Sequence, residues 1–183
     1  MRYFLIVLGA VCLTGFVPRA AQAQVELFGG YSYMRPSVPL TTAVCPGLGL
    51  CSTSTSTDHP NLNGWELTGV YNAYHWIGVA ADFTGEYGSV DGLSTHINTY
   101  LFGPQVRLHT PVSPFAHALF GVAHETVAGT ESSAFAAAVG AGIDIRVAPF
   151  VSFRPIQLDY LVTRFGSGTQ SQPRASAGIM LHF

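Results

Sequence analysis

Charged side chains able to support acid–base chemistry or ion pairing recur at alternate positions along the chain. Paired carboxylates suggest general acid–base catalysis. Carboxylates and arginines on one side of successive strands are equally expected in the wall of a barrel, because side chains alternate across a strand. We favour the second interpretation and predict an inward-facing polar cluster with no catalytic residue. Its members are Glu26, Glu66, Asp82, Glu86, Arg107, Asp144, Arg146, Asp159 and Arg174.

Histidine and serine side chains between residues 117 and 133 are a second candidate for chemistry. His117, His124 and Ser133 lie around one predicted loop, with Glu125 nearby, and such residues could form a lipid hydrolase. His124 falls on the apolar face of its segment, which favours a histidine at a membrane interface. The chain contains neither G-x-S-x-G nor H-E-x-x-H, and no phosphate-loop spacing, so no cofactor is expected.

Two cysteines follow the predicted leader. Cys45 and Cys51 are an even pair in a chain that we expect to be exported, which predicts a local disulfide. A metal site would need further Cys or His ligands at suitable spacing, and only His59 is close. We therefore expect no metal.

The composition is unlike that of an ordinary soluble domain. Only 10% of the residues are charged, there is no lysine, and 48% are hydrophobic, whereas soluble domains have about 25% charged residues. The eight basic residues are outnumbered by ten acidic ones. Proteins that bind nucleic acid usually carry an excess of basic residues, so this charge balance does not favour nucleic-acid binding.

The N-terminus has the features of a secretory signal peptide. Arg2 precedes an apolar run over residues 3–16, which is shorter than the roughly 20 residues that span a bilayer. Ala21 and Ala23 form a small-x-small cleavage site. We expect a signal peptide over residues 1–23, cleaved near Ala23, and one domain over residues 24–183.

The rest of the chain is predicted to be all-β, an eight-stranded antiparallel up-and-down transmembrane β-barrel. Eight segments alternate in polarity, and each is long enough to cross the hydrocarbon as a tilted strand. Pro104 and Pro155 lie inside predicted strands, and each should mark a bulge or a lost ladder bond. The segments are residues 25–34, 64–72, 76–87, 97–108, 115–125, 133–147, 150–163 and 174–183.

The connections between these segments alternate in length. Residues 73–75, 109–113 and 148–149 are short, whereas 35–63, 88–96, 126–132 and 164–173 are longer. This pattern is typical of long extracellular loops and tight periplasmic turns. The longest loop, residues 35–63, is the candidate surface for an extracellular ligand, although a tolerant, solvated loop is the simpler interpretation.

Which face of each strand points outward is not fixed by alternation alone. A soluble lipocalin-like barrel would put the apolar face inside. The polar face carries few charges and many Gly, Ser and Ala, which does not suit a solvated exterior. The apolar face carries Tyr, Trp and Phe near the strand ends, as aromatic girdles at membrane interfaces do. We therefore expect the apolar face to point outward.

Several segments together resemble a known family. They are residues 25–33, 114–122, 140–146, 159–160 and 179–183. With this arrangement the chain resembles the small eight-stranded outer-membrane β-barrels of the OmpA transmembrane-domain and OmpX type. The resemblance implies a location in the bacterial cell outer membrane and membrane lipid as a partner. Phe183 at the end of an alternating strand resembles the signal selected by the outer-membrane assembly machinery.

The function expected from the sequence is a structural or surface-interaction role and not an enzymatic one, with long loops outside and a plugged polar lumen. Arg–carboxylate pairs should hold that plug together. The alternatives are a narrow passive pore whose salt bridges switch partners, a membrane-lipid-modifying enzyme, and a soluble lipocalin-like binding barrel.

Overall fold

The computed structural model describes residues 24–44, 52–58, 60–74, 76–90, 93–127, 129–165 and 168–183. Within these ranges, no helix is long and apolar enough to cross a membrane. The strands are β1 (Gln24–Met34), β2 (Val38–Val44), β3 (Ser52–Asp58), β4 (Leu62–Asn72), β5 (Ile77–Val90), β6 (Leu93–Arg107), β7 (Val112–Val127), β8 (Thr130–Ala148), β9 (Val151–Phe165) and β10 (Gly168–His182).

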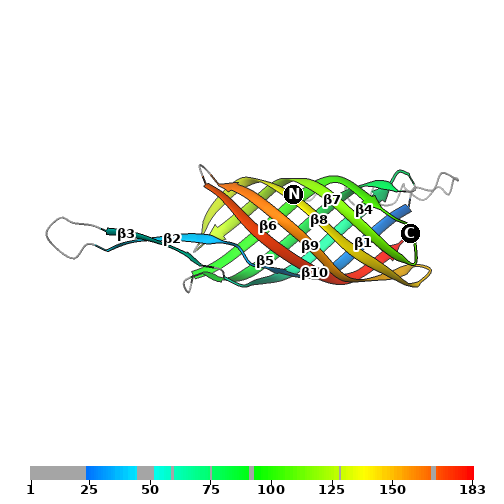
Figure 1. Ribbon diagram of the computed structural model, residues 1–183, viewed down its shortest axis with the longest axis horizontal. Helices are drawn as coiled ribbons and strands as arrows, with labels where there is room; N and C mark the ends of the chain where they lie inside the picture. The colour runs from blue at the N-terminus through cyan, green and yellow to red at the C-terminus, as the bar shows by residue number, and fades with distance from the viewer. Residues whose placement is uncertain are drawn as a thin grey trace, which may run out of the picture.

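Eight of these strands form a closed antiparallel barrel (Figure 1). Its order is β1-β10-β9-β8-β7-β6-β5-β4, and β4 pairs with β1 to close the sheet. Closure gives every strand two neighbours and removes the unpaired edges that lipid cannot satisfy. The predicted all-β, eight-stranded barrel is confirmed, and most strands run further toward the long connections than the sequence suggested.

Strands β2 and β3 lie outside the barrel and form a separate hairpin. They pair from Val38 with Asp58 to Val44 with Ser52, and the hairpin projects beyond one end of the barrel (Figure 1). Residues 35–63 contain the long connection between two barrel strands, and the strand pairing within it was not predicted. Alternating Ser and Thr make β3 a β-prone segment although it is not apolar. The predicted disulfide partners, Cys45 and Cys51, lie outside the described residues.

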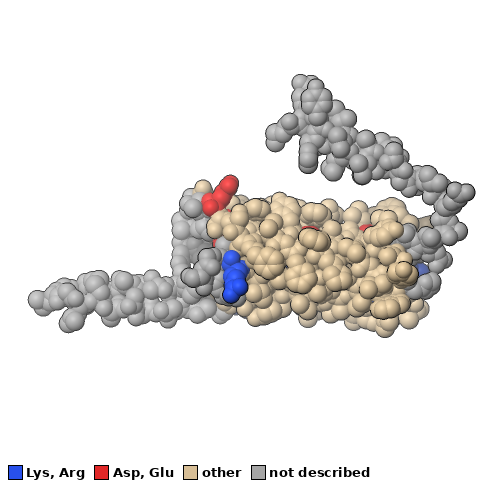
Figure 2. All heavy atoms as spheres, turned by 90° about the horizontal axis from the view of Figure 1, so that it is seen from above, with Lys and Arg blue, Asp and Glu red and all other residues tan. Residues whose placement is uncertain are grey.

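The apolar face of the strands points outward. Phe102 and Val139 are each 65% exposed, whereas Asp82 on the opposite face is fully buried. The space-filling view shows an almost wholly tan surface along the barrel, with the largest charged patches at one end of it (Figure 2). The soluble-barrel alternative, with the apolar face inside, is therefore wrong.

Exposed charges on the described strands lie close to strand ends. Glu131 and Arg164 lie at the end with the long connections, and Arg146 lies near the short turns. Aromatic hydroxyls also mark the long-connection end, where Tyr33 donates a hydrogen bond of 2.6 Å to Asn61. Such residues suit the two membrane–water interfaces, and the uncharged wall between them suits hydrocarbon.

The two prolines inside strands disturb the sheet in different ways. Around Pro155 the register between β9 and β10 shifts between Ser176 and Gly178, which is a β-bulge. At Pro104 the β6–β7 register is unchanged, but Gly103 and Pro104 have no assigned partner on β7. Both prolines thus behave as predicted, because proline has no N–H to give to the ladder.

Candidate functional site: the polar lumen

The interior of the barrel holds most of the charged side chains that the sequence singled out. Each comes from an inward-facing position of a strand, and each is at most 4% exposed. These residues are Glu26, Glu66, Asp82, Glu86, Arg107, Asp144, Asp159 and Arg174. The ninth candidate, Arg146, is exposed and does not join them.

One group of charges is centred on Arg174 of β10. Its Nη2 lies 2.7 Å from Asp82 Oδ2 and 2.7 Å from Asp159 Oδ2, and its Nε lies 3.9 Å from Glu66 Oε2. Charge-assisted contacts of this kind are about twice as strong as neutral hydrogen bonds. A single guanidinium therefore ties together β4, β5, β9 and β10 across the lumen.

Gln157 extends this network along the lumen. Its amide nitrogen donates to Glu66 Oε1 and Asp159 Oδ2 at 2.8 Å each. Its amide oxygen accepts a hydrogen bond of 2.5 Å from Arg154 Nη1. His117 Nε2 lies 2.9 Å from Asp159 Oδ1 on the other side. The lumen charges are thus linked into a chain of contacts and are not isolated pairs.

A second group of charges lies nearer the short turns. Arg107 contacts Glu26 at 2.7 Å and Asp144 at 2.5 Å. Arg154 binds Asp144 with Nε and Nη2, at 2.7 and 3.1 Å. Its guanidinium also lies 4.2 Å from the ring centre of Phe28, a cation–π distance. The Phe115 ring lies 4.1 Å from the same guanidinium, so two arginines and two aromatic rings fill this part of the lumen.

The first and last strands of the barrel, β1 and β10, are linked through His182. His182 Nδ1 lies 3.1 Å from Glu26 Oε1, and His182 Nε2 lies 2.7 Å from Ser152 Oγ. Glu26 and Ser152 are 1% and 2% exposed, and His182 is 8% exposed. A carboxylate, an imidazole and a hydroxyl therefore form a continuous hydrogen-bonded line on β1, β10 and β9.

Glu86 is bound differently from the other carboxylates. It is fully buried and accepts a hydrogen bond of 2.5 Å from Ser32, while its Oε2 has no hydrogen-bond partner among the described residues. Counting the buried residues described, six carboxylates face three guanidinium groups in the lumen. The acidic excess makes each arginine important, because unpaired buried charges are costly.

Apolar side chains fill the lumen toward the long connections. Met34 and Leu62 lie at the strand ends there and are fully buried, and Ile97, Leu119 and Leu161 belong to the same cluster. An eight-stranded barrel is only wide enough for its side chains to fill. Among the described residues, apolar side chains therefore fill much of that part of the lumen, and Thr95, Thr163 and Gln172 are buried there as well.

Arg146 differs from the prediction because it lies close to the end of its strand. Arg146 pairs with Ser152, and the β8–β9 register shifts on both sides of this pair. It lies near the end of β8, where the barrel opens, so the side chain is exposed at the rim. A strict period of two identified the face correctly but gave no measure of depth.

Arg154 was missed by the sequence analysis although it is 1% exposed. Counting back from Asp159 in steps of two places Arg154 on the outer face. The bulge at Pro155 leaves Pro155 and Ile156 both exposed and returns Arg154 to the interior. The proline itself was the available signal, since bulges reset the alternation.

His124 and Ser133 form a pair on the outside of the barrel. His124 Nδ1 lies 2.8 Å from Ser133 Oγ, and the His124 ring meets Tyr100 edge-on. Nucleophilic sites orient the histidine with a third group, and here its second neighbour is an aromatic ring. His117, by contrast, is buried in the lumen. Within the described ranges, no three His, Cys, Asp or Glu side chains are arranged to hold a metal ion.

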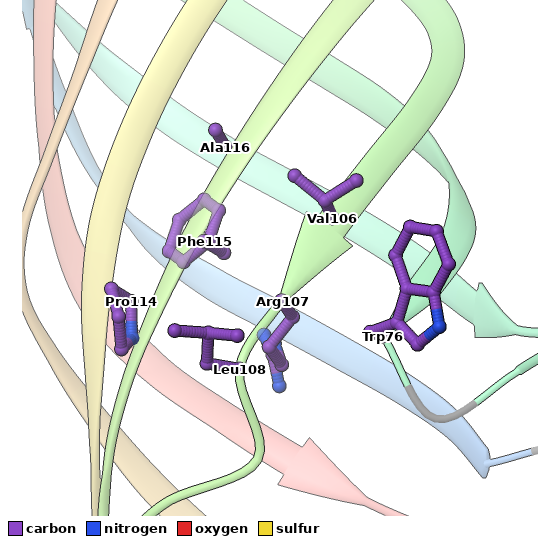
Figure 3. Close-up of a pocket in the computed structure, with 7 residues that line it drawn as sticks. All are labelled: Trp76, Val106, Arg107, Leu108, Pro114, Phe115 and Ala116. Carbon is purple, nitrogen blue, oxygen red and sulfur yellow. The ribbon is translucent and has the colours of Figure 1, made fainter.

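A shallow apolar groove of about 270 Å³ lies between β6 and β7 near the short turns (Figure 3). Its exposed walls are formed by Trp76, Val106, Leu108, Pro114 and Ala116. The groove opens on the outward apolar surface, and the buried side chains of Arg107 and Phe115 also line it.

Comparisons with known proteins show which solved structures have a similar fold. No family model and no curated protein sequence matches the chain. Among solved structures, Neisserial surface protein A gives a TM-score of 0.57 at 14% identity and covers 87% of this chain and 97% of its own. The attachment invasion locus protein Ail of Yersinia pestis gives 0.52 at 17% identity, covering 89% of this chain and 100% of its own.

A third structure, the outer membrane protein OprG from Pseudomonas aeruginosa, gives a TM-score of 0.53 at 14% identity over 88% of this chain and 96% of its own. The chain thus has the fold of the small eight-stranded outer-membrane β-barrels. At these identities the likeness concerns the fold, and residue roles have to be argued from the site itself.

Proposed function

We propose that this protein resides in the bacterial outer membrane, where it has a structural or surface-interaction role that is not enzymatic. The observation that carries the proposal is the uncharged apolar wall of a closed barrel, bounded by charged and aromatic residues at its two ends. Residues 1–23 would be removed as a signal peptide near Ala23 before assembly. Phe183, 70% exposed at the C-terminus, would be the residue read by the assembly machinery.

The orientation in the membrane follows from the lengths of the connections. The β2–β3 hairpin and the other long connections leave one end, while the short turns and the C-terminus lie at the other (Figure 1). Outer-membrane barrels place long loops outside and short turns in the periplasm. The hairpin would therefore project from the cell surface.

We assign the surface interaction to the segment of residues 35–63, since the hairpin within it extends furthest from the barrel (Figure 1). Ail has been solved in complex with the heparin analogue sucrose octasulfate, and this supports a search for extracellular ligands. Deletion of residues 45–57 should abolish binding of expressing cells to a host-cell or extracellular-matrix surface. Unchanged attachment, with the deleted barrel still shifting on a gel after boiling, would remove this assignment.

The packed lumen argues against the narrow-pore alternative. Arg107, Arg154 and Arg174 all bind carboxylates, and buried apolar side chains fill further parts of the lumen. Pure protein in a planar bilayer should therefore be electrically silent. Conductance steps that change in Arg107→Ala or Arg146→Ala would support a gated pore and overturn the plugged lumen.

A further inference from the structure

The line of contacts through His182 has the connectivity of a nucleophilic serine site. Ser152 Oγ lies 2.7 Å from Nε2 of the ring, and Glu26 Oε1 lies 3.1 Å from Nδ1. Neutral histidine with its proton on Nδ1 would donate to Glu26 and accept from the Ser152 hydroxyl. This is the arrangement in which a histidine activates serine and a carboxylate orients the histidine.

The sheet places these three residues side by side. Glu26 and His182 are direct partners in the β1–β10 ladder, and Ser152 pairs with Met180 in the β10–β9 ladder. All three lie within three residues of a strand end, at the end of the barrel with the short turns. His182, at 8%, is the most exposed of the buried polar side chains described, and it is the last residue of β10.

The exposed Arg146 lies on the neighbouring strand, beside Ser152. It is the direct partner of Ser152 in the β8–β9 ladder, and such partners share a face with Cβ atoms about 4.5–5.5 Å apart. A guanidinium at the rim beside the hydroxyl would bind a carboxylate group or stabilise an oxyanion. Such a role would explain why Arg146 lies at the rim and not in the buried lumen network.

We propose that Ser152, His182 and Glu26 form an esterase-like site at the short-turn mouth of the barrel, acting on small anionic carboxylic esters that Arg146 binds. Ser152 and His182 would be catalytic residues, and Glu26 a positioning residue. The inference does not depend on the surface role of the long loops, because it concerns the opposite end of the molecule.

The reaction balances without any added redox partner. The Ser152 oxygen attacks the ester carbonyl carbon while His182 Nε2 takes the hydroxyl proton. Collapse of the tetrahedral intermediate breaks the bond to the leaving alkoxide, which receives that proton, and the acyl group remains on Ser152. Water, deprotonated by His182, then releases the carboxylic acid and regenerates the serine.

A purely structural seam contact is the competing explanation, and other serines of the lumen show what that looks like. Ser32 and Ser176 donate directly to Glu86 and Glu66, with no histidine between them. The Ser152 hydroxyl instead meets an imidazole that is itself held by a carboxylate. A reactive serine distinguishes the two explanations, because a structural hydroxyl does not attack an electrophile.

The first test uses a fluorophosphonate probe on full-length protein refolded in detergent, with intact mass and peptide mapping as readouts. Wild type should gain one adduct on Ser152, Ser152→Ala should gain none, and His182→Gln should react roughly 100-fold more slowly. Ser113→Ala is the matched control, since Ser113 lies at the same end and is more exposed, and it should label normally. A folded wild type that stays unlabelled, or a label that persists in Ser152→Ala, overturns the proposal.

The second test measures hydrolysis of 4-nitrophenyl hemisuccinate and of the uncharged 4-nitrophenyl acetate. Arg146→Gln should raise KM for the anionic ester only. Glu26→Gln should lower kcat with KM unchanged, and Glu26→Asp should restore part of kcat. Variants that change neither constant while retaining the heat-dependent gel shift would show that the contacts only hold the seam.

Discussion

Replacing Arg174 by methionine should strongly destabilise the barrel. Arg174 is 2% exposed and contacts Asp82 and Asp159 at 2.7 Å each. At an effective dielectric of 20, a charge pair about 4 Å apart is worth roughly 4 kcal/mol. The loss of two such pairs is partly offset by the desolvation of the guanidinium, so we expect a net loss of about 3–5 kcal/mol in the free energy of unfolding.

The assay for this prediction is urea unfolding in lipid vesicles, followed by tryptophan fluorescence. Arg164→Met removes an exposed arginine on β9 and should stay within about 0.5 kcal/mol of wild type. Adding Asp82→Asn to Arg174→Met should recover about 1–3 kcal/mol, because it removes a carboxylate left without its cation. An Arg174→Met barrel within about 1 kcal/mol of wild type would refute this reasoning.

Three further predictions concern the wall, the packing and the C-terminus. Val139→Arg, at a 65% exposed position in the middle of β8, should cost about 2–4 kcal/mol in bilayer unfolding experiments; no cost would mean that this face does not contact hydrocarbon. Gly140→Val should prevent efficient refolding, because a Cβ there would lie 1.8 Å from Asp159 Oδ1, whereas Gly69→Val has open space and should refold normally; equal refolding yields would contradict the packing. Phe183→Ala should lower the amount of protein in the outer membrane without changing its stability after refolding, and unchanged membrane levels would remove the proposed assembly signal.

The barrel and the inward charges were predictable because both depend on a period of two. Glu66 and Asp82 each lie inside a regular run, so their burial follows from alternation with apolar neighbours. Which face points outward also followed from composition, since a chain with so few charges cannot solvate a polar exterior. The alternation of polar and apolar residues was sufficient to predict the eight barrel strands.

At irregular positions of the backbone, the sequence pattern did not predict which side chains are buried. The bulge at Pro155 brings Arg154 inside, and the shifts around Arg146 accompany its position at the rim. The burial of Arg154 does not follow from alternation, because a bulge changes the count by one residue. Alternation gives the face of Arg146 but not its depth along the barrel. Strands β2 and β3 escaped prediction because their sequence lacks the apolar repeat that marks membrane strands.

The line through His182 could not be found along the chain. Glu26, Ser152 and His182 are far apart in sequence and come together only because β10 lies between β1 and β9. Their pairing depends on barrel closure and on the register of two ladders. A sequence search for local motifs would not detect it.

Outer-membrane fractionation, followed by gel electrophoresis with and without boiling, tests the central claim most directly. A closed barrel held in lipid by its apolar wall should be recovered in the outer-membrane fraction and should change mobility when heat unfolds it. Recovery in the soluble periplasmic fraction, with the same mobility before and after boiling, would contradict the membrane-spanning barrel.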